Sequence, residues 1–448
     1  MSIQLVLLLL LSLSDSSASP ARVVRLKLRR VSWRPPATRL SSSWQHPVTP
    51  PATDAESLHN FRDVQYYGLV GYGTPQQWFT VLVDTGSPVT WLPTGSWCAS
   101  NGGCAGHNGF TPAASSTCVA LPSTVNVAYG DGSSVQGAYV SDVMTLAGLE
   151  VQDVSVSLVS AGSAPSDGVF DGLLGLGLAS GGMPLNVAQQ AVQRGLLPAP
   201  VFSFWLNPDP LQPENGGEFA LGGLAVQAGA PLVWVNVSSR ELGGWPVPMS
   251  GVWVGGEKLG CVHGCVAGID TGTSLIMGPP DEVSAIYGAI NAALRAAGGA
   301  RGNCALAALR MPLLSFGLGG SMLVLRPDQY LRRTQYGVLT CEASLAPIAS
   351  ANFTVGSPTW LLGDAFLGAY ATTFDCRSGS VGFSVALRPP AVTQRQLWLV
   401  SNILIRVGTV SLALTFAYLL TIRFSKPGGK RISEQIVIEM PNRSLAVP

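Results

Sequence analysis

The sequence is poor in residues that bind metals or nucleic acids. It has only four histidines in 448 residues, and 11% of its residues are charged. With so few histidines, no cluster of His and Cys ligands forms along the chain, so we expect no metal site. Residues 63–388 contain 20 acidic and 11 basic residues, which gives −20 + 11 = −9. This central body therefore lacks the broad basic surface that is typical of nucleic-acid binding.

Helical patterns are also scarce. Only 184–195 and 281–297 carry apolar residues at helical spacing, whereas apolar runs bounded by some of the 52 glycines dominate. The chain is long enough for more than one hydrophobic core, and we expect a mainly β protein. A nucleotide-binding loop at Gly175-Leu176-Gly177 is rejected, because the third glycine and a βαβ pattern are both missing.

An Asp-Thr-Gly triplet occurs twice, each time directly after an apolar run. The copies begin at Asp84 and Asp270, and a hydroxyl residue follows each. One copy would be weak evidence, because such short stretches often mark only a turn. Two copies in similar contexts indicate an internal repeat whose halves meet, although two strand-end turns are the simpler alternative.

Two aspartates brought together have a specific chemistry. Carboxylates a few ångströms apart cannot both ionise easily, so one can act as a base and the other as an acid at the same pH. Such a pair can activate a shared water against an amide. Six neighbours should assist by bonding backbone, by allowing close approach, or by donating to the carboxylates, and they are Thr85, Thr271, Gly86, Gly272, Ser87 and Thr273.

Further motifs follow in a fixed order around the two triplets. Residues 64–80 predict a strand, a Gly-Thr-Pro turn and a second strand, and 127–133 predict a hairpin tip. Apolar-apolar-Gly stretches occur at 170–175 and 360–364. From about 64 to 387 the chain resembles the pepsin-like aspartic peptidases. This resemblance implies an all-β, bilobal fold with two β lobes related by a pseudo-two-fold axis, few short helices, and a cleft between the lobes.

The same resemblance assigns roles to several side chains. Pro88 stands where the family usually has a serine, which removes an N–H but leaves both aspartates in place. The hairpin tip is expected to form the flap over the substrate, with Tyr129, Gly130 and Asp131 in it and Trp91 bracing it. Apolar substrate pockets are expected at Phe170 and Leu173.

The eight cysteines favour an oxidising compartment. The resemblance implies three disulfides, and they are Cys98–Cys104, Cys261–Cys265 and Cys304–Cys341. Cys118 and Cys376 are left over, and they could bridge the lobes, pair with a partner or stay free.

The N-terminal region carries targeting and basic signals. We expect a cleaved signal peptide at 1–18 and a basic pro-segment at 19–62, with the peptidase domain at 63–388 divided into lobes of about 63–230 and 231–388. Residues 20–62 hold 8 basic and 2 acidic residues, and 8 − 2 = +6. This segment should dock on the acidic body, although a disordered basic linker is the alternative.

The C-terminal region predicts a membrane anchor. A stem at 389–396 precedes an apolar run at 397–422 that contains Arg406, and a basic tail at 423–448 should lie in the cytosol. An amphipathic surface helix is the alternative. Asn236 and Asn352 begin glycosylation sequons on the lumenal side.

Together these features predict a single-pass type I membrane protein of the secretory pathway or cell surface, with its catalytic domain in the lumen or outside the cell. It should be a monomeric aspartic endopeptidase that needs no cofactor and cleaves polypeptides, resembling beta-secretase-like or other membrane-anchored members of the family. The alternatives are a catalytically silent peptide-binding protein and an adhesion receptor on the same fold.

Overall fold

The computed structural model describes residues 23–30, 66–100, 107–129, 133–162, 170–179, 182–207, 216–225, 231, 233–241, 243–296, 308–334, 340–348 and 359–385. All of them belong to one compact unit that spans 1–387. The predicted signal peptide, stem, membrane span and tail lie outside the described residues, as does most of the predicted pro-segment. In the described part of the chain, no helix is long and apolar enough to cross a membrane.

The described residues are mostly β-structure, as the sequence predicts. In the first half the strands are β1 (Val24–Arg30), β2 (Tyr66–Tyr72), β3 (Gln77–Asp84), β4 (Trp91–Pro93), β5 (Val119–Ala128), β6 (Ser134–Leu146), β7 (Leu149–Gly162), β8 (Gly172–Gly175), β9 (Val201–Leu206), β10 (Gly217–Leu221) and β11 (Val233–Asn236). In the second half they are β12 (Pro246–Val254), β13 (Glu257–Gly260), β14 (Cys265–Ile269), β15 (Ile276–Gly278), β16 (Leu314–Leu318), β17 (Ser321–Leu325), β18 (Leu331–Thr334), β19 (Thr340–Ala343), β20 (Leu345–Pro347), β21 (Trp360–Leu362), β22 (Tyr370–Asp375) and β23 (Ser380–Val385).

The helices are short. They are α1 (Gly95–Ala99), the 3-10 turn η1 (Pro112–Ala114), α2 (Val187–Gln193), α3 (Pro280–Ala296), α5 (Pro327–Tyr330) and α6 (Asp364–Leu367). Both helices predicted from apolar spacing are confirmed within a few residues. Asn186 caps α2 and forms a reciprocal capping box with Gln189. The face that α3 buries carries the four apolar residues at helical spacing, Val283, Ile286, Ile290 and Leu294.

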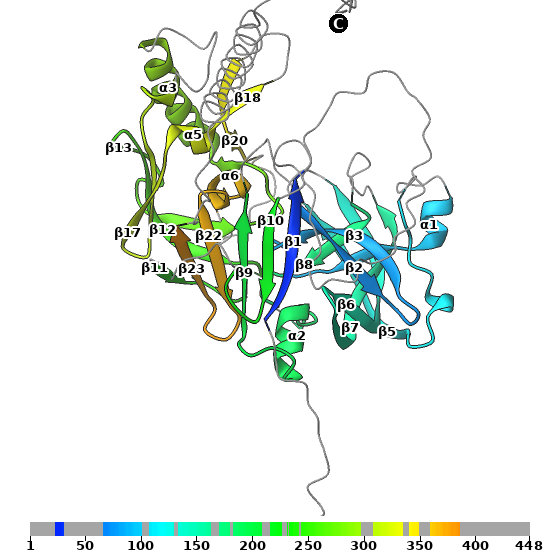
Figure 1. Ribbon diagram of the computed structural model, residues 1–448. Coiled ribbons are helices and arrows are strands. Elements are labelled where there is room, and N and C mark those ends of the chain that lie inside the picture. Colours follow the sequence, from blue (N-terminus) through cyan, green and yellow to red (C-terminus); the bar gives the residue numbers. More distant parts are fainter. Residues whose placement is uncertain are drawn as a thin grey trace, which may run out of the picture. The chain divides into compact units, whose positions relative to one another are not determined.

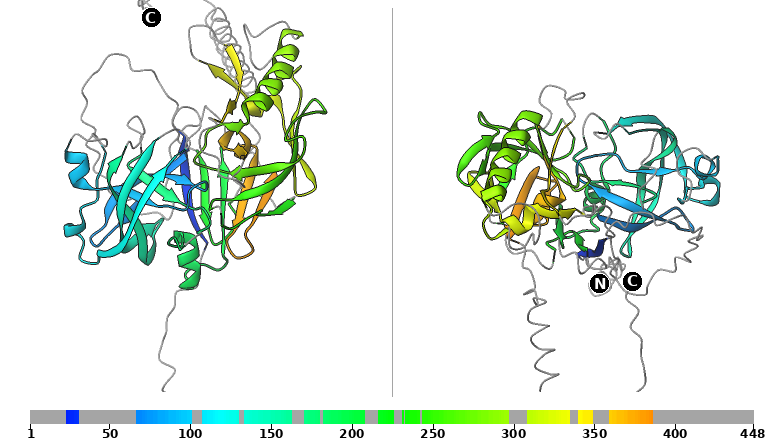
Figure 2. Two further views of the ribbon diagram at one scale, coloured as in Figure 1. Left: turned by 180° about the vertical axis from the view of Figure 1, so that it is seen from behind. Right: turned by 90° about the horizontal axis from the view of Figure 1, so that it is seen from above.

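Two large sheets organise the molecule. One has 13 strands in the order β11-β23-β22-β9-β10-β1-β2-β3-β8-β4-β7-β6-β5, and the other has eight, β17-β16-β12-β14-β21-β15-β20 with β13 beside β12. Strands β22 and β23, near the end of the described chain, pair with β9 and β11 in the larger sheet. The predicted lobe boundary near residue 230 therefore divides the sequence but does not divide this sheet (Figures 1 and 2).

A four-strand unit occurs once in each half with the same pairing. In the first half β3 pairs with β8 in parallel, β8 with β4 antiparallel, and β4 with β7 in parallel. In the second half β14 pairs with β21 in parallel, β21 with β15 antiparallel, and β15 with β20 in parallel. The internal repeat predicted from the two triplets is thus visible in the order and sense of the strands.

Strand β1 comes from within the segment predicted to be a separate pro-segment. It lies between β10 and β2 (Figure 1), pairing residues 24–28 with β10 and Arg29 and Arg30 with β2. Val24 and Leu26 are buried, and Nε of Arg25 lies 3.4 Å from a carboxylate oxygen of Glu218. The expectation of electrostatic docking is therefore incomplete, because backbone pairing and apolar burial also hold β1 in the sheet.

An aromatic cluster contains a tryptophan that is hydrogen-bonded to the chain near both triplets. The ring of Phe374 lies 4.9 Å from that of Phe202 and 5.0 Å from that of Trp245. The indole nitrogen of Trp245 donates to the carbonyl of Leu176 at 2.9 Å, and its own carbonyl accepts from the N–H of Ile269. Trp245 thereby links the chain beside the first triplet to the strand that precedes the second.

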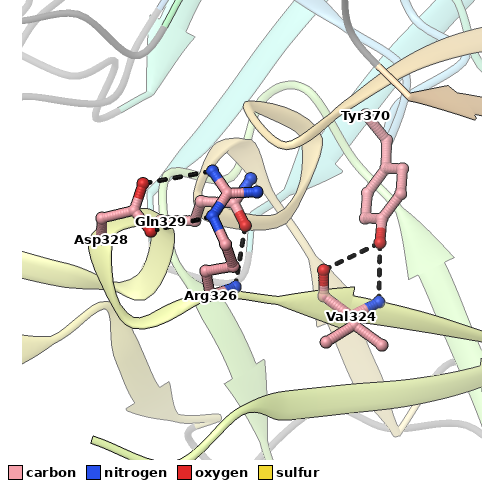
Figure 3. Close-up of polar contacts among 5 residues, drawn as sticks. All are labelled: Val324, Arg326, Asp328, Gln329 and Tyr370. Carbon is pink, nitrogen blue, oxygen red and sulfur yellow. Dashed lines mark hydrogen bonds and ion pairs between the residues drawn. The ribbon is translucent and has the colours of Figure 1, made fainter. Parts of the chain in front are cut away.

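A tyrosine joins the two sheets in the second half (Figure 3). The hydroxyl of Tyr370, at the start of β22, accepts from the N–H of Val324 at 2.6 Å and donates to its carbonyl at 2.9 Å. Beside this contact, Arg326 forms an ion pair with Asp328, and its N–H donates to the side chain of Gln329 at the start of α5. The two bonds of Tyr370 hold the end of β17 against β22, whereas the contacts of Arg326 are local.

The cysteines give one complete disulfide among the described residues, between Cys261 and Cys265. Cys98 is also disulfide-bonded. Cys104 and Cys304 lie outside the described residues, and the same holds for the side chain of Cys341. Cys118 and Cys376, whose pairing the sequence left open, are both free thiols.

The first prediction concerns β1. Leu26 is only 1% exposed, so Leu26→Ala should lower the free energy of unfolding of the unprocessed chain by about 2–5 kcal/mol. Denaturant unfolding measures this change. The matched control is Val385→Ala at a strand residue that is 54% exposed, where the change should stay within about 0.5 kcal/mol. Equal stability of the two variants would show that β1 is not part of the folded sheet.

Candidate active site

The two Asp-Thr-Gly triplets meet at the ends of equivalent strands. Asp84 is the last residue of β3, and Asp270 directly follows β14. Each of these strands is paired in parallel with the strand of its own apolar-apolar-Gly motif, β8 or β21. The buried strands that precede the two aspartates therefore fix the backbone position of each aspartate.

Two threonines lock the triplets together by reciprocal hydrogen bonds. The N–H of Thr85 donates to Oγ1 of Thr271, and the N–H of Thr271 donates to Oγ1 of Thr85, both at 3.0 Å. Each hydroxyl in turn donates to a carbonyl of the opposite half, Thr85 to Ile269 at 2.8 Å and Thr271 to Val83 at 2.7 Å. Both threonines are buried, so each hydroxyl uses its donor and its acceptor function on the other half of the molecule.

The glycines of the triplets bring the opposite carboxylate close. A Cβ atom placed on Gly86 would lie 2.5 Å from Cγ of Asp270, and one on Gly272 would lie 2.5 Å from Oδ1 of Asp84. Any larger residue would collide with the aspartate of the other half. The two carboxyl groups are hydrogen-bonded to each other. This geometry agrees with the interpretation, made from the sequence, that the two glycines allow the backbone to come close to the carboxylates.

Backbone and hydroxyl groups hold each carboxylate in place. The N–H of Gly86 donates to Oδ1 of Asp84, and the N–H of Gly272 donates to Oδ1 of Asp270, both at 2.8 Å. The hydroxyl of Thr273 donates to Oδ2 of Asp270 at 2.6 Å. This is the arrangement that the sequence predicts for the second triplet.

The first triplet differs at the residue beside Pro88. The hydroxyl of Ser87 accepts from the N–H of Val89 at 3.2 Å. Both carboxylates therefore accept from the glycine N–H of their own triplet, and Asp270 also accepts from the hydroxyl of Thr273.

Burial and charge repulsion both act on Asp84. Its side chain lies in the protein interior, and the nearby carboxylate of Asp270 opposes a second negative charge. Burial first, and then Asp270, raise the pKa of Asp84 well above its usual value, while the N–H groups of Gly86 and Ser87 act in the opposite direction. The pair therefore keeps a proton at pH values at which isolated aspartates would lose theirs.

Hydrogen bonds join the chain at the end of β8 to the first triplet and to Thr90, a residue that was not identified from the sequence. The carbonyl of Asp84 accepts from the N–H of Leu176 at 2.7 Å, and the carbonyl of Ser87 accepts from Gly177 at 3.0 Å. Oγ1 of the buried Thr90 accepts from the N–H of Gly175 at 3.1 Å. A hydroxyl residue between Val89 and Trp91, inside an apolar stretch, is the signal that could have identified it.

The predicted flap residues belong to one apolar cluster. The indole nitrogen of Trp91 donates to the hydroxyl of Tyr129 at 2.7 Å. Tyr129 packs on a buried cluster that includes Trp91, Phe170 and Leu173. It stands at the turn of the β5–β6 hairpin, where its N–H donates to the carbonyl of Ser133. Four of the six predicted residues are thus brought together, and the other two, Gly130 and Asp131, lie outside the described residues.

Asp171, beside Phe170, anchors this region and was also missed as a supporting residue. Its carboxylate accepts from the backbone N–H groups of Thr80 and Asn108, each at 2.8 Å, and lies 3.5 Å from Nδ1 of His107. It thereby joins β3, the start of β8 and the segment around Asn108. Across the described ranges, no three His, Cys, Asp or Glu side chains are grouped as a metal site.

Comparisons with known proteins agree with this geometry. The family model described as eukaryotic aspartyl protease matches residues 65–386. Napsin-A of Homo sapiens is 37% identical over 82% of this chain and 90% of its own length. Cathepsin D of Rattus norvegicus is 35% identical, with 85% and 98% covered, and cathepsin E-B of Xenopus laevis is 34% identical, with 75% and 83% covered. The chain belongs to the eukaryotic aspartyl protease family. The resemblance found in the sequence is confirmed, and membership makes the chain an aspartic-type endopeptidase.

The second prediction tests the threonine contacts. Thr85→Val should lower the free energy of unfolding by about 1–3 kcal/mol or more, because it leaves the carbonyl of Ile269 and the N–H of Thr271 without their partner. Thr85→Ser keeps the hydroxyl and should retain most of the stability. Denaturant unfolding of both variants gives the comparison. A Ser variant as unstable as the Val variant would show that the methyl group, and not the hydroxyl, matters.

The third prediction concerns pH. The pKa of Asp84 is higher in the folded protein than its usual value of 3.8. Between those two values the folded state holds more protons than the unfolded chain, so the free energy of unfolding falls as pH rises. The stability difference between wild type and Asp84→Asn should be most favourable to wild type below pH 3.8. It should then decline as pH rises through the raised pKa. Unfolding measured across this range checks the sign, and a difference that does not change with pH would contradict it.

Proposed function

We propose that Asp84 and Asp270 jointly activate a water molecule that attacks the scissile amide of a polypeptide. The shared proton allows one carboxyl group to donate to the substrate carbonyl while the other accepts a proton from the water. The observation that carries this proposal is the reciprocal approach of each carboxylate to the glycine of the other triplet. This approach holds the two carboxyl groups next to each other, which would not be expected of two unrelated turns.

The hydrogen bond between Trp91 and Tyr129 supports a role for the β5–β6 hairpin in substrate binding. The hairpin closes over the bound peptide and excludes bulk water from the reacting atoms. Phe170 and Leu173 contribute apolar surface for substrate side chains in the cleft between the two halves. They belong to the same cluster as Tyr129, so peptide binding and hairpin position are coupled.

Residues 19–62 act as an inhibitory pro-segment of this enzyme. Their charge of +6 complements the −9 of the body, and the pairing of β1 with β10 and β2 attaches the segment to the sheet. Acid weakens the electrostatic part of this attachment by protonating carboxylates such as Glu218. Cleavage by the enzyme itself or by another protease then completes activation.

The enzyme works in the secretory pathway or at the cell surface, anchored by residues 397–422. The apolar N-terminal run, the Cys261–Cys265 disulfide and the basic residues after 422 support this location. Alkaline carbonate should leave the full-length protein in the membrane fraction. Extraction by carbonate would contradict a spanning anchor.

The decisive experiment replaces each aspartate separately. Asp84→Asn and Asp270→Asn should each lower kcat/KM for a cleavable peptide by about 100- to 10,000-fold or more, because one carboxyl group cannot act as both acid and base. The matched control is Asp153→Asn, at an exposed carboxylate paired with Arg194, which should keep full activity. Folding of each variant is checked by its melting temperature.

The silent peptide-binding alternative gives a different pattern. Wild type would then bind a statine-type inhibitor or a peptide without turnover, and the Asn variants would change affinity alone. Wild-type turnover by either folded Asn variant would contradict the proposed mechanism.

A further inference from the structure

Strand β11 presents a large apolar side chain to solvent next to a modifiable asparagine. Along Val233–Asn236 the burial alternates, with Val233 and Val235 buried and Trp234 and Asn236 exposed. The two exposed side chains are two residues apart on one face of an extended strand, so their Cα atoms are roughly 7 Å apart. Trp234 is 45% exposed. A single exposed tryptophan is common on protein surfaces and does not by itself indicate a ligand, but Trp234 lies beside Asn236, which can be glycosylated.

The indole of Trp234 lies flat on the sheet. Its partner across the ladder is Gly382 of β23. A Cβ placed on Gly382 would be 3.0 Å from each of three fused-ring atoms of Trp234, Cδ2, Cε2 and Cε3. Equal distances to three ring atoms mean that the face of the indole, and not its edge, covers this glycine. The opposite face is therefore the exposed one.

Asn236 begins the sequon Asn-Val-Ser at the point where β11 ends. The residues after it are held by backbone bonds, since the N–H of Val237 donates to Gly379 at 2.9 Å and that of Ser238 to Pro246 at 2.7 Å. The base of any group attached to Asn236 is thus fixed relative to Trp234.

A second glycine near Asn236 is also covered by a flat side chain. Arg240 is exposed, and its Nη2 donates to the carbonyl of Arg377 at 2.7 Å. The guanidinium passes within 2.6 Å of where a Cβ on Gly379 would lie. Asn236 is paired with Ser380 and lies near two glycines, of which Gly382 is covered by the indole of Trp234 and Gly379 by the guanidinium of Arg240.

We propose that Asn236 carries an N-linked glycan whose first N-acetylglucosamine stacks on the exposed face of Trp234. One face of this sugar presents C–H groups and can pack on an aromatic plane, while its hydroxyl and acetamido groups stay in water or reach donors such as those of Arg240. In the transfer step, Nδ2 of Asn236 forms a bond to C1 of the sugar. The bond from C1 to the diphosphate of a lipid-linked oligosaccharide donor breaks, the lipid diphosphate leaves, and the amide loses one proton to the transferase. This inference rests on the proposed secretory location and not on the peptidase mechanism.

The stacked sugar should stabilise the folded protein only when both partners are present. The test uses the full-length chain expressed in a eukaryotic cell and purified from its membrane fraction, in wild type, Asn236→Gln, Trp234→Ala and the double variant. Mass spectrometry of the Asn236 peptide should show the glycan. Removing the glycan by Asn236→Gln should lower Tm by about 1–3 °C when Trp234 is present, and by much less in the Trp234→Ala background.

Two controls separate stacking from general effects of glycosylation. Trimming with an endoglycosidase that leaves only the first sugar should retain the stabilisation, because that sugar makes the contact. Trp234→Phe, which keeps an aromatic face, should retain part of it. Asn352→Gln removes the other predicted lumenal sequon and should show no coupling to Trp234.

The outcomes that overturn the inference are distinct from a failure of the proposed function. Glycosylation at Asn352 with Asn236 bare refutes the site while the secretory location stands. Equal Tm losses in both Trp234 backgrounds refute the stacking. No glycan at any sequon, together with free thiols at Cys261 and Cys265, refutes the site and the location together. In every case peptide cleavage by Asn236→Gln should match wild type, so the mechanism is judged separately.

Discussion

The crossed hydrogen bonds of Thr85 and Thr271 are the contact on which the rest of the site depends. Each residue uses its backbone N–H and its hydroxyl on the opposite half, so four bonds close a ring at the boundary between the two repeats. Because these groups are buried, breaking one bond leaves a polar group without water to replace its partner. The ring therefore sets the separation of the neighbouring aspartates with little freedom. An acid pair that shares a proton needs this constancy, since its protonation depends steeply on distance.

The strand units around this ring explain how one chain supplies two equivalent carboxylates. Each aspartate ends a buried strand that is paired in parallel with the strand of an apolar-apolar-Gly motif. The copies differ in detail, because the hydroxyl of Thr273 donates to Asp270 whereas the hydroxyl of Ser87 accepts from the N–H of Val89. The strands around the two carboxylates are thus nearly symmetric, but the hydrogen bonds to the carboxylates are not. This difference suits the proposed reaction, in which one carboxyl group donates a proton while the other accepts one.

The parts of the molecule that sequence could predict are those encoded locally. The triplets, the capped helix after Asn186 and the amphipathic face of α3 depend on neighbours within a few residues, and each was predictable. The contacts of Thr90 and Asp171 were not predicted, because their partners lie 85 and 91 residues away, and even the unusual hydroxyl of Thr90 within an apolar stretch does not identify its partner. The insertion of β1 was missed for the same reason, since the sequence predicted only a basic segment that docks on the acidic body and the partner strand β10 follows some 190 residues later. The assignment of strands β22 and β23 to the sheet of the first half also depends on long-range pairing.

If the proposed pro-segment is cleaved, the position of β1 determines what the cut does to the fold. The strand is an interior member of the larger sheet, with hydrogen-bonded neighbours on both sides. A cut after Arg30 therefore does not trim an appendage. Either the severed strand stays in place and the mature enzyme is a two-chain molecule, or β10 and β2 lose their common neighbour and another stretch of chain must satisfy their backbone groups. In the first case the order of the strands is kept, and in the second the proposed activation rearranges the sheet itself.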